Sequence, residues 1–122
     1  MLKIDKLHFG EYCEYKVIAN LLRFNFDIFL PIVDDKGIDC IIRKKDGSIT
    51  ELQIKGRQPR WIFNIGRFKP RKNYFFALIP PDNKIYVVPS FIVFEWLGGR
   101  DKFVLSQKRR LQKYIDAYDQ LS

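Results

Sequence analysis

The pattern of apolar and polar residues near the beginning of the chain has the period of an α-helix. At about 100° per residue, most apolar side chains of residues 9–26 project onto one arc of a helical wheel. This arc contains Gly10, Cys13, Val17, Ile18, Leu21, Leu22 and Phe24. The pattern predicts an amphipathic helix over residues 9–26 whose apolar arc packs against the rest of the protein.

Beyond this helix, short apolar runs are separated by turn residues, which is typical of β-strands. Residues 34–37 and 45–48 have turn chemistry, and the second turn lies between two runs that can pair as a hairpin. We expect strands over residues 26–33, interrupted at Pro31, and over residues 38–43, 49–55, 73–79 and 84–88.

The last part of the chain combines helical and strand patterns. Ser90 can cap a helix that runs through Leu97 and ends at Gly98. A short strand is expected over residues 103–105. Ser106 can cap a final helix with one apolar face, formed by Leu111, Tyr114, Ile115, Tyr118 and Leu121. The order of elements predicts an α/β (α+β) fold whose central mixed β-sheet is flanked by helices, and the length predicts a single domain over residues 1–122.

Composition narrows the chemistry that is available. With 47% hydrophobic residues, the chain can form a core without disulfides, and Cys13 and Cys40 lie in apolar patterns that predict buried thiols. The single histidine, His8, argues against a zinc site and against catalysis by a Ser–His or Cys–His pair. There is no run of roughly 18 apolar residues and no signal-peptide pattern, so we expect a cytosolic (cytoplasmic) protein that does not associate with membranes.

The charge of the chain points to a polyanionic partner. The formal net charge is +8, and basic residues gather with aromatic ones, Trp61, Phe63 and Phe68, over residues 55–72. Such a mixture suits a surface that contacts phosphates and stacks on bases. The residues expected to contact DNA are Arg57, Gln58, Arg60, Arg67, Lys69, Arg71 and Lys72. The alternative is a solvated edge strand whose lysines discourage aggregation.

Two acidic residues stand at positions where an apolar side chain would be expected. Glu14 lies near the middle of the apolar arc of the first helix, where a carboxylate is costly unless it is paired or bound to a cation. An internal salt bridge would satisfy it equally. Asp39 stands at the start of an isoleucine-rich strand, and aspartate is a poor strand former. Capping of the preceding turn is its alternative explanation.

The strand over residues 49–55 contains a polar row. Leu52 and Ile54 would face one side, and Glu51, Gln53 and Lys55 the other. The hairpin would place Asp39 beside this row. Carboxylate and amide oxygens bind a hard cation such as Mg²⁺, and a neighbouring lysine can orient or deprotonate a nucleophilic water.

Glu14, the run Gly37-Ile38-Asp39 and the run Gln53-Ile54-Lys55 together resemble the signature of the PD-(D/E)xK nuclease superfamily. They are similar to the branch that contains Holliday-junction resolvases and homing endonucleases. The resemblance implies a restriction-endonuclease-like core and an endonuclease that hydrolyses DNA with Mg²⁺, or Mn²⁺ in its place. It also implies catalytic roles for Glu14, Asp39, Gln53 and Lys55, with Asp39, Gln53 and Glu14 as metal ligands. Gln53 stands where the superfamily usually has an acid, which removes one negative charge.

Two other functions fit the same residues. One is a catalytically weak or inactive nucleic-acid-binding module of the same fold, and the other is an interaction domain whose charge only keeps it in solution. A nuclease of this length needs a second copy to cut both strands, so we expect a homodimer or a higher homo-oligomer. Residues 91–96 and the final helix are candidate surfaces, and the cluster Lys108-Arg109-Arg110 could bind a phosphate.

Overall fold

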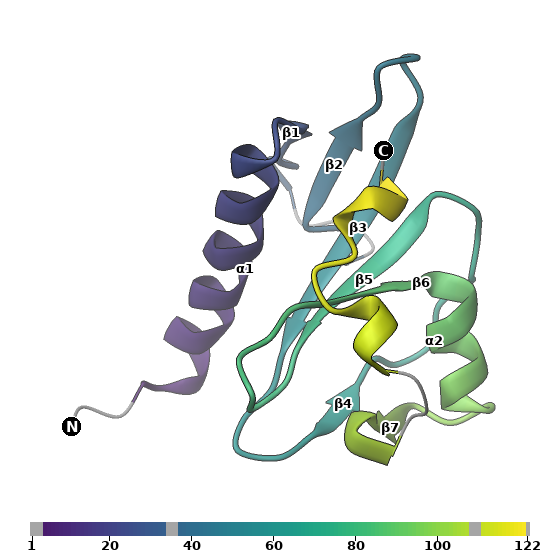
Figure 1. Ribbon diagram of the computed structural model, residues 1–122. Helices are drawn as coiled ribbons and strands as arrows, with labels where there is room; N and C mark the ends of the chain where they lie inside the picture. The colour runs from purple at the N-terminus through teal and green to yellow at the C-terminus, as the bar shows by residue number, and fades with distance from the viewer. Residues whose placement is uncertain (1–3, 34–36, 108–110, 122) are drawn as a thin grey trace.

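The computed structural model describes residues 4–33, 37–107 and 111–121. Figure 1 shows the elements in chain order. They are α1 (Lys6–Arg23), β1 (Asp27–Phe29), β2 (Cys40–Arg43), β3 (Ile49–Gly56), β4 (Ile62–Asn64), β5 (Tyr74–Ile79), β6 (Tyr86–Pro89), α2 (Ser90–Leu97), β7 (Lys102–Val104) and three 3₁₀ turns, η1 (Leu105–Gln107), η2 (Leu111–Tyr114) and η3 (Tyr118–Leu121).

The main sheet has five strands in the order β1-β2-β3-β5-β6. β3 and β5 run parallel, and the other neighbouring strands run antiparallel. The predicted central mixed sheet is therefore confirmed. β4 and β7 form a separate two-stranded sheet, and β4 lies within the basic run of residues 55–72, where the hydrophobic pattern does not predict an element.

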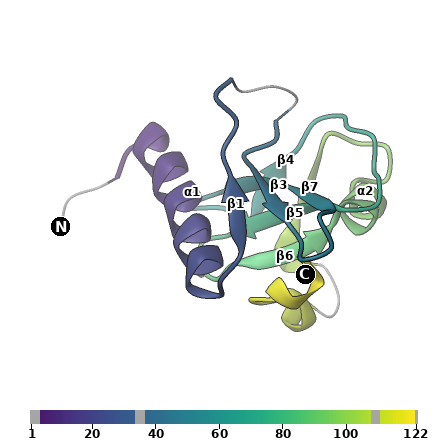
Figure 2. The same cartoon turned by 90° about the horizontal axis from the view of Figure 1, so that it is seen from above.

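Each face of the main sheet has its own hydrophobic cluster, because successive strand residues point to opposite faces. On one face, Cys13, Val17 and Leu21 of α1 pack against alternate strand residues that include Leu52 and Ile54. On the other face, α2 packs against strand residues that include Phe76 and Val88, and the β4–β7 sheet joins the same cluster. Figure 2 shows α1 and α2 on opposite sides of the sheet. The prediction of helices flanking the sheet is confirmed.

The N-terminal helix begins before its expected start. Asp5 caps α1, since its side chain accepts a hydrogen bond from the backbone N–H of His8 at 2.9 Å. The helix ends at Arg23, and Asn25 then adopts a left-handed conformation with φ of 65°, so Phe26 lies outside the helix. In the described part of the chain, no helix combines the length and the apolar character needed to cross a bilayer.

α1 approaches the sheet most closely at Gly56, the last residue of β3. A β-carbon at Gly56 would lie 2.3 Å from Sγ of Cys13, which is closer than atoms can pack, and 3.0 Å from the ring of Phe9. Cys13 and Cys40 are both buried free thiols, as predicted. The glycine at the end of β3 therefore allows the helix that carries Glu14 to lie directly against the strand that carries Gln53 and Lys55.

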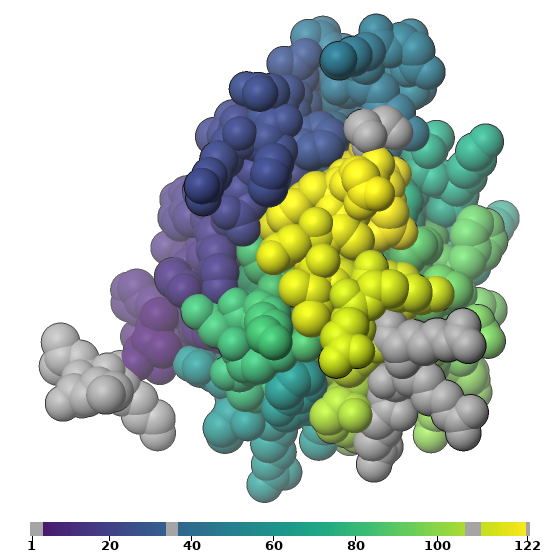
Figure 3. All heavy atoms as spheres, in the orientation of Figure 1, coloured from purple at the N-terminus to yellow at the C-terminus, as the bar shows by residue number. Residues whose placement is uncertain are grey.

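The final helix predicted after Ser106 is wrong. The segment instead forms short 3₁₀ turns, and Asp116 interrupts it with a left-handed φ of 50°. Ile115 pairs with Tyr86 as an isolated bridge, while Tyr114 belongs to one hydrophobic cluster and Tyr118 to the other. Figure 3 shows this segment, in yellow, on the face of the molecule that is turned toward the viewer. A single straight helix could not place Tyr114 and Tyr118 in two clusters on opposite faces of the sheet. The Lys108-Arg109-Arg110 cluster lies outside the described residues.

Three further expectations are corrected by the structure. The strand predicted over residues 26–33 is limited to Asp27–Phe29. Ser90 does not cap α2, because its hydroxyl accepts from the backbone N–H of Arg71 at 3.1 Å and donates to the Arg71 carbonyl at 2.8 Å. The prediction that Phe63 stacks on bases is wrong, since this side chain is completely buried against Phe103. Trp61 and Phe68 are half-buried against the same cluster.

Candidate active site

Asp39 is joined to the strand that carries the Gln53-Ile54-Lys55 run. Its backbone N–H donates to the carbonyl of Leu52 at 2.9 Å, which extends the β2–β3 ladder by one residue. Its carboxylate oxygen Oδ2 accepts from the backbone N–H of Ile54 at 2.6 Å. Ile54 is the middle residue of the run, so the carboxylate of Asp39 is held between the positions of Gln53 and Lys55.

Gln53 is a polar side chain in a buried position, with 9% of its surface exposed. Its oxygen Oε1 accepts from the hydroxyl of Tyr74 at 2.6 Å. Gly37 lies against the other end of the amide, because a β-carbon built on Gly37 would be 2.9 Å from Nε2. Burial raises the pKa of Tyr74 to about 12, so the phenol keeps its proton at neutral pH. The Gln53 amide is thus enclosed by a hydrogen-bond donor and a glycine.

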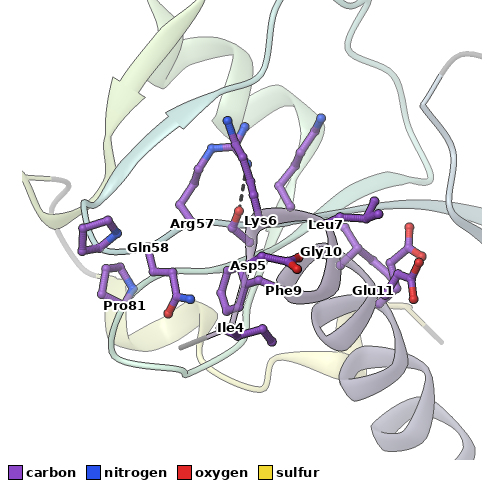
Figure 4. Close-up of a pocket in the computed structure, with 15 residues that line it drawn as sticks. Ile4, Asp5, Lys6, Leu7, Phe9, Gly10, Glu11, Arg57, Gln58 and Pro81 are labelled. Carbon is purple, nitrogen blue, oxygen red and sulfur yellow. Dashed lines mark hydrogen bonds between the residues drawn. The ribbon is translucent and has the colours of Figure 1, made fainter. Parts of the chain in front are cut away.

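A cavity of about 1050 Å³ opens between the start of α1 and the end of β3, and we call it the first cavity. Glu14 and Lys55 both line it, so the structure brings these two predicted residues together. Figure 4 shows residues from the start of α1, among them Phe9, together with Arg57 and Gln58 in the lining of this cavity. The guanidinium of Arg57 is held by its own main chain, donating to the Gly56 carbonyl at 2.8 Å.

The carboxylates of Glu14 and Asp39 act on the same buried group. The pKa of the Cys40 thiol is raised to about 12, mainly by burial and further by the negative charges of Asp39 and Glu14. α1 itself packs against β3 through Cys13, Val17 and Leu21.

A second cavity, of about 700 Å³, lies beside Gln53. Its lining includes Gln53, Glu51, Tyr74 and three of the cations predicted to bind DNA, Arg67, Lys69 and Arg71. The polar row of β3 is therefore divided, since Glu51 and Gln53 line the second cavity and Lys55 lines the first.

The basic residues predicted to contact DNA are distributed over both cavities. Arg57 and Gln58 line the first cavity, and Arg67, Lys69 and Arg71 line the second. Arg60 and Lys72 are exposed but line neither of them. Arg71 is engaged with Glu51, to which its Nη2 donates at 2.8 Å, and the more exposed Arg67 lies 3.8 Å from Asp101.

The oxygen donors of this region suit a hard cation better than a soft one. Asp39 and Glu14 offer carboxylates and Gln53 offers an amide oxygen, which are the ligands that Mg²⁺ prefers. Within the described ranges, no group of three His, Cys, Asp or Glu side chains is arranged to hold a metal ion. A cation here would therefore depend on the amide of Gln53 as well as on carboxylates.

Tyr74 is the residue of this region that the sequence does not reveal. In the sequence it is one aromatic residue of an apolar strand, 21 positions away from Gln53. It reaches Gln53 because β5 runs parallel to β3, with Tyr74 paired to Glu51. The only signal in the sequence is a hydroxyl-bearing residue at the start of a strand that is otherwise apolar.

Comparison with known proteins places the fold. The chain is similar to a solved structure described as "The structure of a bacterial homing endonuclease: I-Ssp6803I", with a TM-score of 0.67 and 14% sequence identity. The similarity covers 95% of this chain and 92% of that chain. No family model and no curated protein sequence matches the chain. The two proteins thus share an α+β fold with a central mixed sheet over nearly their whole length.

Proposed function

We propose that this protein is a metal-dependent DNA endonuclease of the PD-(D/E)xK type. The observation that carries the proposal is the hydrogen bond from the Ile54 N–H to the Asp39 carboxylate at 2.6 Å. It joins the aspartate of the signature to the centre of the Gln-x-Lys run across the β2–β3 hairpin. The fold shared with a bacterial homing endonuclease supports the same function.

Each residue of the signature has a chemical role in this proposal. Asp39 and the amide oxygen of Gln53 would hold Mg²⁺, or Mn²⁺ in its place, and Glu14 would bind it directly or through water. The cation would stabilise the charge that develops on the phosphate during hydrolysis. Lys55, which shares the first cavity with Glu14, would orient the water that attacks the phosphorus.

The basic surface would bind the DNA backbone on both sides of this centre. Arg57, Gln58 and Arg60 follow directly after β3 and would contact phosphates near the first cavity. Arg67, Lys69, Arg71 and Lys72 would contact phosphates near the second cavity, with Arg71 also supporting the site through Glu51. A homodimer would place two such centres on one duplex. The exposed aromatic rings of Phe91 and Phe94 on α2 are a candidate contact between copies.

The proposal is tested by cleavage of plasmid and branched DNA with Mg²⁺, with Mn²⁺ and with a chelator. We expect cleavage that needs the cation and that Asp39→Asn and Lys55→Ala each reduce by at least about a hundredfold. Asp27→Asn and Lys45→Ala serve as matched controls, because both side chains are exposed and line neither cavity. Cleavage that continues in the chelator, or that survives both site substitutions, would refute the proposal.

One observation favours a second function, a nucleic-acid-binding module without catalysis. Gln53 is neutral, and the described residues contain no group of three acidic, His or Cys side chains that could hold a metal. A module of this kind would bind DNA through the same cations with an affinity that falls as salt rises. Salt-dependent binding without cleavage in either cation, unchanged by Asp39→Asn, is the result that would favour this function.

A further inference from the structure

A glutamine can ligate a cation only if its amide is held the right way round. The amide has an oxygen at one end and a nitrogen with two hydrogens at the other, whereas a carboxylate has two equivalent oxygens. A hard cation accepts only the oxygen. A site in which Gln53 replaces the usual acid therefore needs a further group that distinguishes the two ends of the amide.

Tyr74 makes the contact that could do this. Its hydroxyl lies 2.6 Å from Oε1 of Gln53, a distance typical of an O–H donor on an oxygen acceptor and short for an N–H donor. An amide oxygen has two lone pairs, and it can accept from Tyr74 while it binds a cation with the other.

The ring of Tyr74 is held in place on several sides. The guanidinium of Arg71 lies 4.1 Å from the ring centroid, and the rings of Phe76 and Phe68 lie at 5.2 Å and 6.0 Å. Arg71 is itself fixed by two hydrogen bonds to Oε1 of Glu51, at 2.8 Å and 3.1 Å. The packed neighbours therefore hold the Tyr74 ring, and with it the hydroxyl, in a fixed position beside Gln53.

We infer that Tyr74 is a positioning residue, whose hydroxyl fixes the Gln53 amide with its oxygen available to a divalent cation. The inference rests on the proposed metal-dependent function and extends it to a residue outside the signature. It gives a physical reason why a neutral glutamine can occupy this position.

The test is a square of four proteins: wild type, Tyr74→Phe, Gln53→Glu and the double variant. Mn²⁺ affinity is measured by calorimetry, which does not depend on cleavage. We expect Tyr74→Phe to weaken Mn²⁺ binding about tenfold in the glutamine protein. In the Gln53→Glu background the same substitution should change affinity by less than about twofold, because either carboxylate oxygen can face the cation. A ¹⁵N spectrum without metal should show a shifted side-chain NH₂ signal of Gln53 in Tyr74→Phe.

Tyr86→Phe is the matched control. Tyr86 is a buried tyrosine of the neighbouring strand β6, and its hydroxyl makes a bond of the same length, 2.6 Å, to Asp82. The Tyr86→Phe variant should bind Mn²⁺ with the same affinity as the wild type. Equal losses in both backgrounds, or no loss in the glutamine protein, would overturn the inference while leaving the proposed function intact. Absence of saturable Mn²⁺ binding in both the wild type and Gln53→Glu would overturn the proposed function, and the inference with it.

Discussion

Gly37 lies against the side-chain amide of Gln53, so a side chain at position 37 would have to displace that amide. A β-carbon there would lie 2.9 Å from Nε2 and 3.3 Å from Oε1 of the amide, and Gly37 has a left-handed φ of 74°. The glycine is therefore required by its backbone conformation and by its neighbour. This explains physically why glycine stands two residues before Asp39.

Gly37→Ala should lose both stability and metal binding. Alanine pays about 1 kcal/mol for the left-handed backbone, and its methyl group would push the Gln53 amide away. Gly47→Ala is the matched control, because Gly47 has a similar φ of 89° but nothing within 4 Å of its added β-carbon. Urea unfolding should show a comparable loss of stability from backbone strain in both variants. Mn²⁺ calorimetry should show weakened binding in Gly37→Ala alone. Equal Mn²⁺ affinities would show that the contact with Gln53 is unimportant.

Gly56→Ala should separate α1 from β3. The added methyl would meet Sγ of Cys13 at 2.3 Å, and overpacking of this kind costs about 1–3 kcal/mol of the free energy of unfolding. The double variant Gly56→Ala/Cys13→Gly should recover part of the loss attributable to the clash, as a double-mutant cycle in urea would detect.

Gly10→Ala is the control for this helix. Gly10 lies within α1 and has nothing within 4 Å of its added β-carbon, so alanine there should stabilise the protein by about 0.5–1 kcal/mol. If Gly56→Ala did not lower the free energy of unfolding relative to Gly10→Ala, α1 would not approach β3 as closely as described.

Thr50→Val should leave the protein as stable as the wild type or make it more stable. Thr50 is completely buried on β3, and its hydroxyl oxygen is the one buried side-chain polar atom within the described residues that has no hydrogen-bond partner. Removing an unsatisfied hydroxyl without changing the side-chain shape should gain about 1 kcal/mol. Thr50→Ser keeps the hydroxyl and loses the methyl, so it should be destabilising by about 1 kcal/mol. A clear loss of stability in Thr50→Val would indicate that the hydroxyl has a partner.

The two cysteines should be unreactive in the native protein. Burial raises the pKa of Cys13 to about 11 and that of Cys40 to about 12, so almost no thiolate is present at pH 8. Labelling with a thiol reagent should be slow in buffer and should reach two thiols per chain in denaturant. Rapid labelling of the folded protein at pH 8 would contradict the burial of these residues.

The same pKa shifts give a direction for alkaline stability. Each thiol has a folded pKa above its usual value near 9, so the native state favours the protonated form. The contribution to stability is complete below pH 9 and is lost as the pH rises toward 11 and beyond. Cys13→Ala should reduce the fall in unfolding free energy over this range, relative to wild type, in urea titrations at increasing pH.

Local patterns predicted most of the fold. The helical period around Val17, the hairpin turn at Gly47 and the apolar run at Phe76 depend on neighbours in the chain, and each led to an element that the structure contains. The last segment was not predictable in this way. Its apolar residues have helical spacing, but they are divided between two clusters on opposite faces of the sheet, and the chain must bend at Asp116 to reach both.

The candidate site shows the same division. The types and order of Glu14, Asp39, Gln53 and Lys55 are properties of the sequence, because they depend on the chemistry of each side chain and on strand alternation. Hairpin pairing is local, so the proximity of Asp39 to the Gln53-Ile54-Lys55 run could be anticipated from the turn between them. The hydrogen bond between the Ile54 N–H and Asp39 agrees with that expectation. The roles of the four residues in catalysis and metal binding stay predictions.

Only the tertiary structure decided which residues far apart in the chain come into contact. The parallel pairing of β3 with β5 delivers Tyr74 to Gln53, and the packing of α1 on Gly56 brings Glu14 to the cavity that Lys55 lines. These contacts follow from how whole faces are buried against one another, which no local period encodes. The sequence by itself determined which groups could do the chemistry, and the burial of two faces of one sheet decided which of them meet.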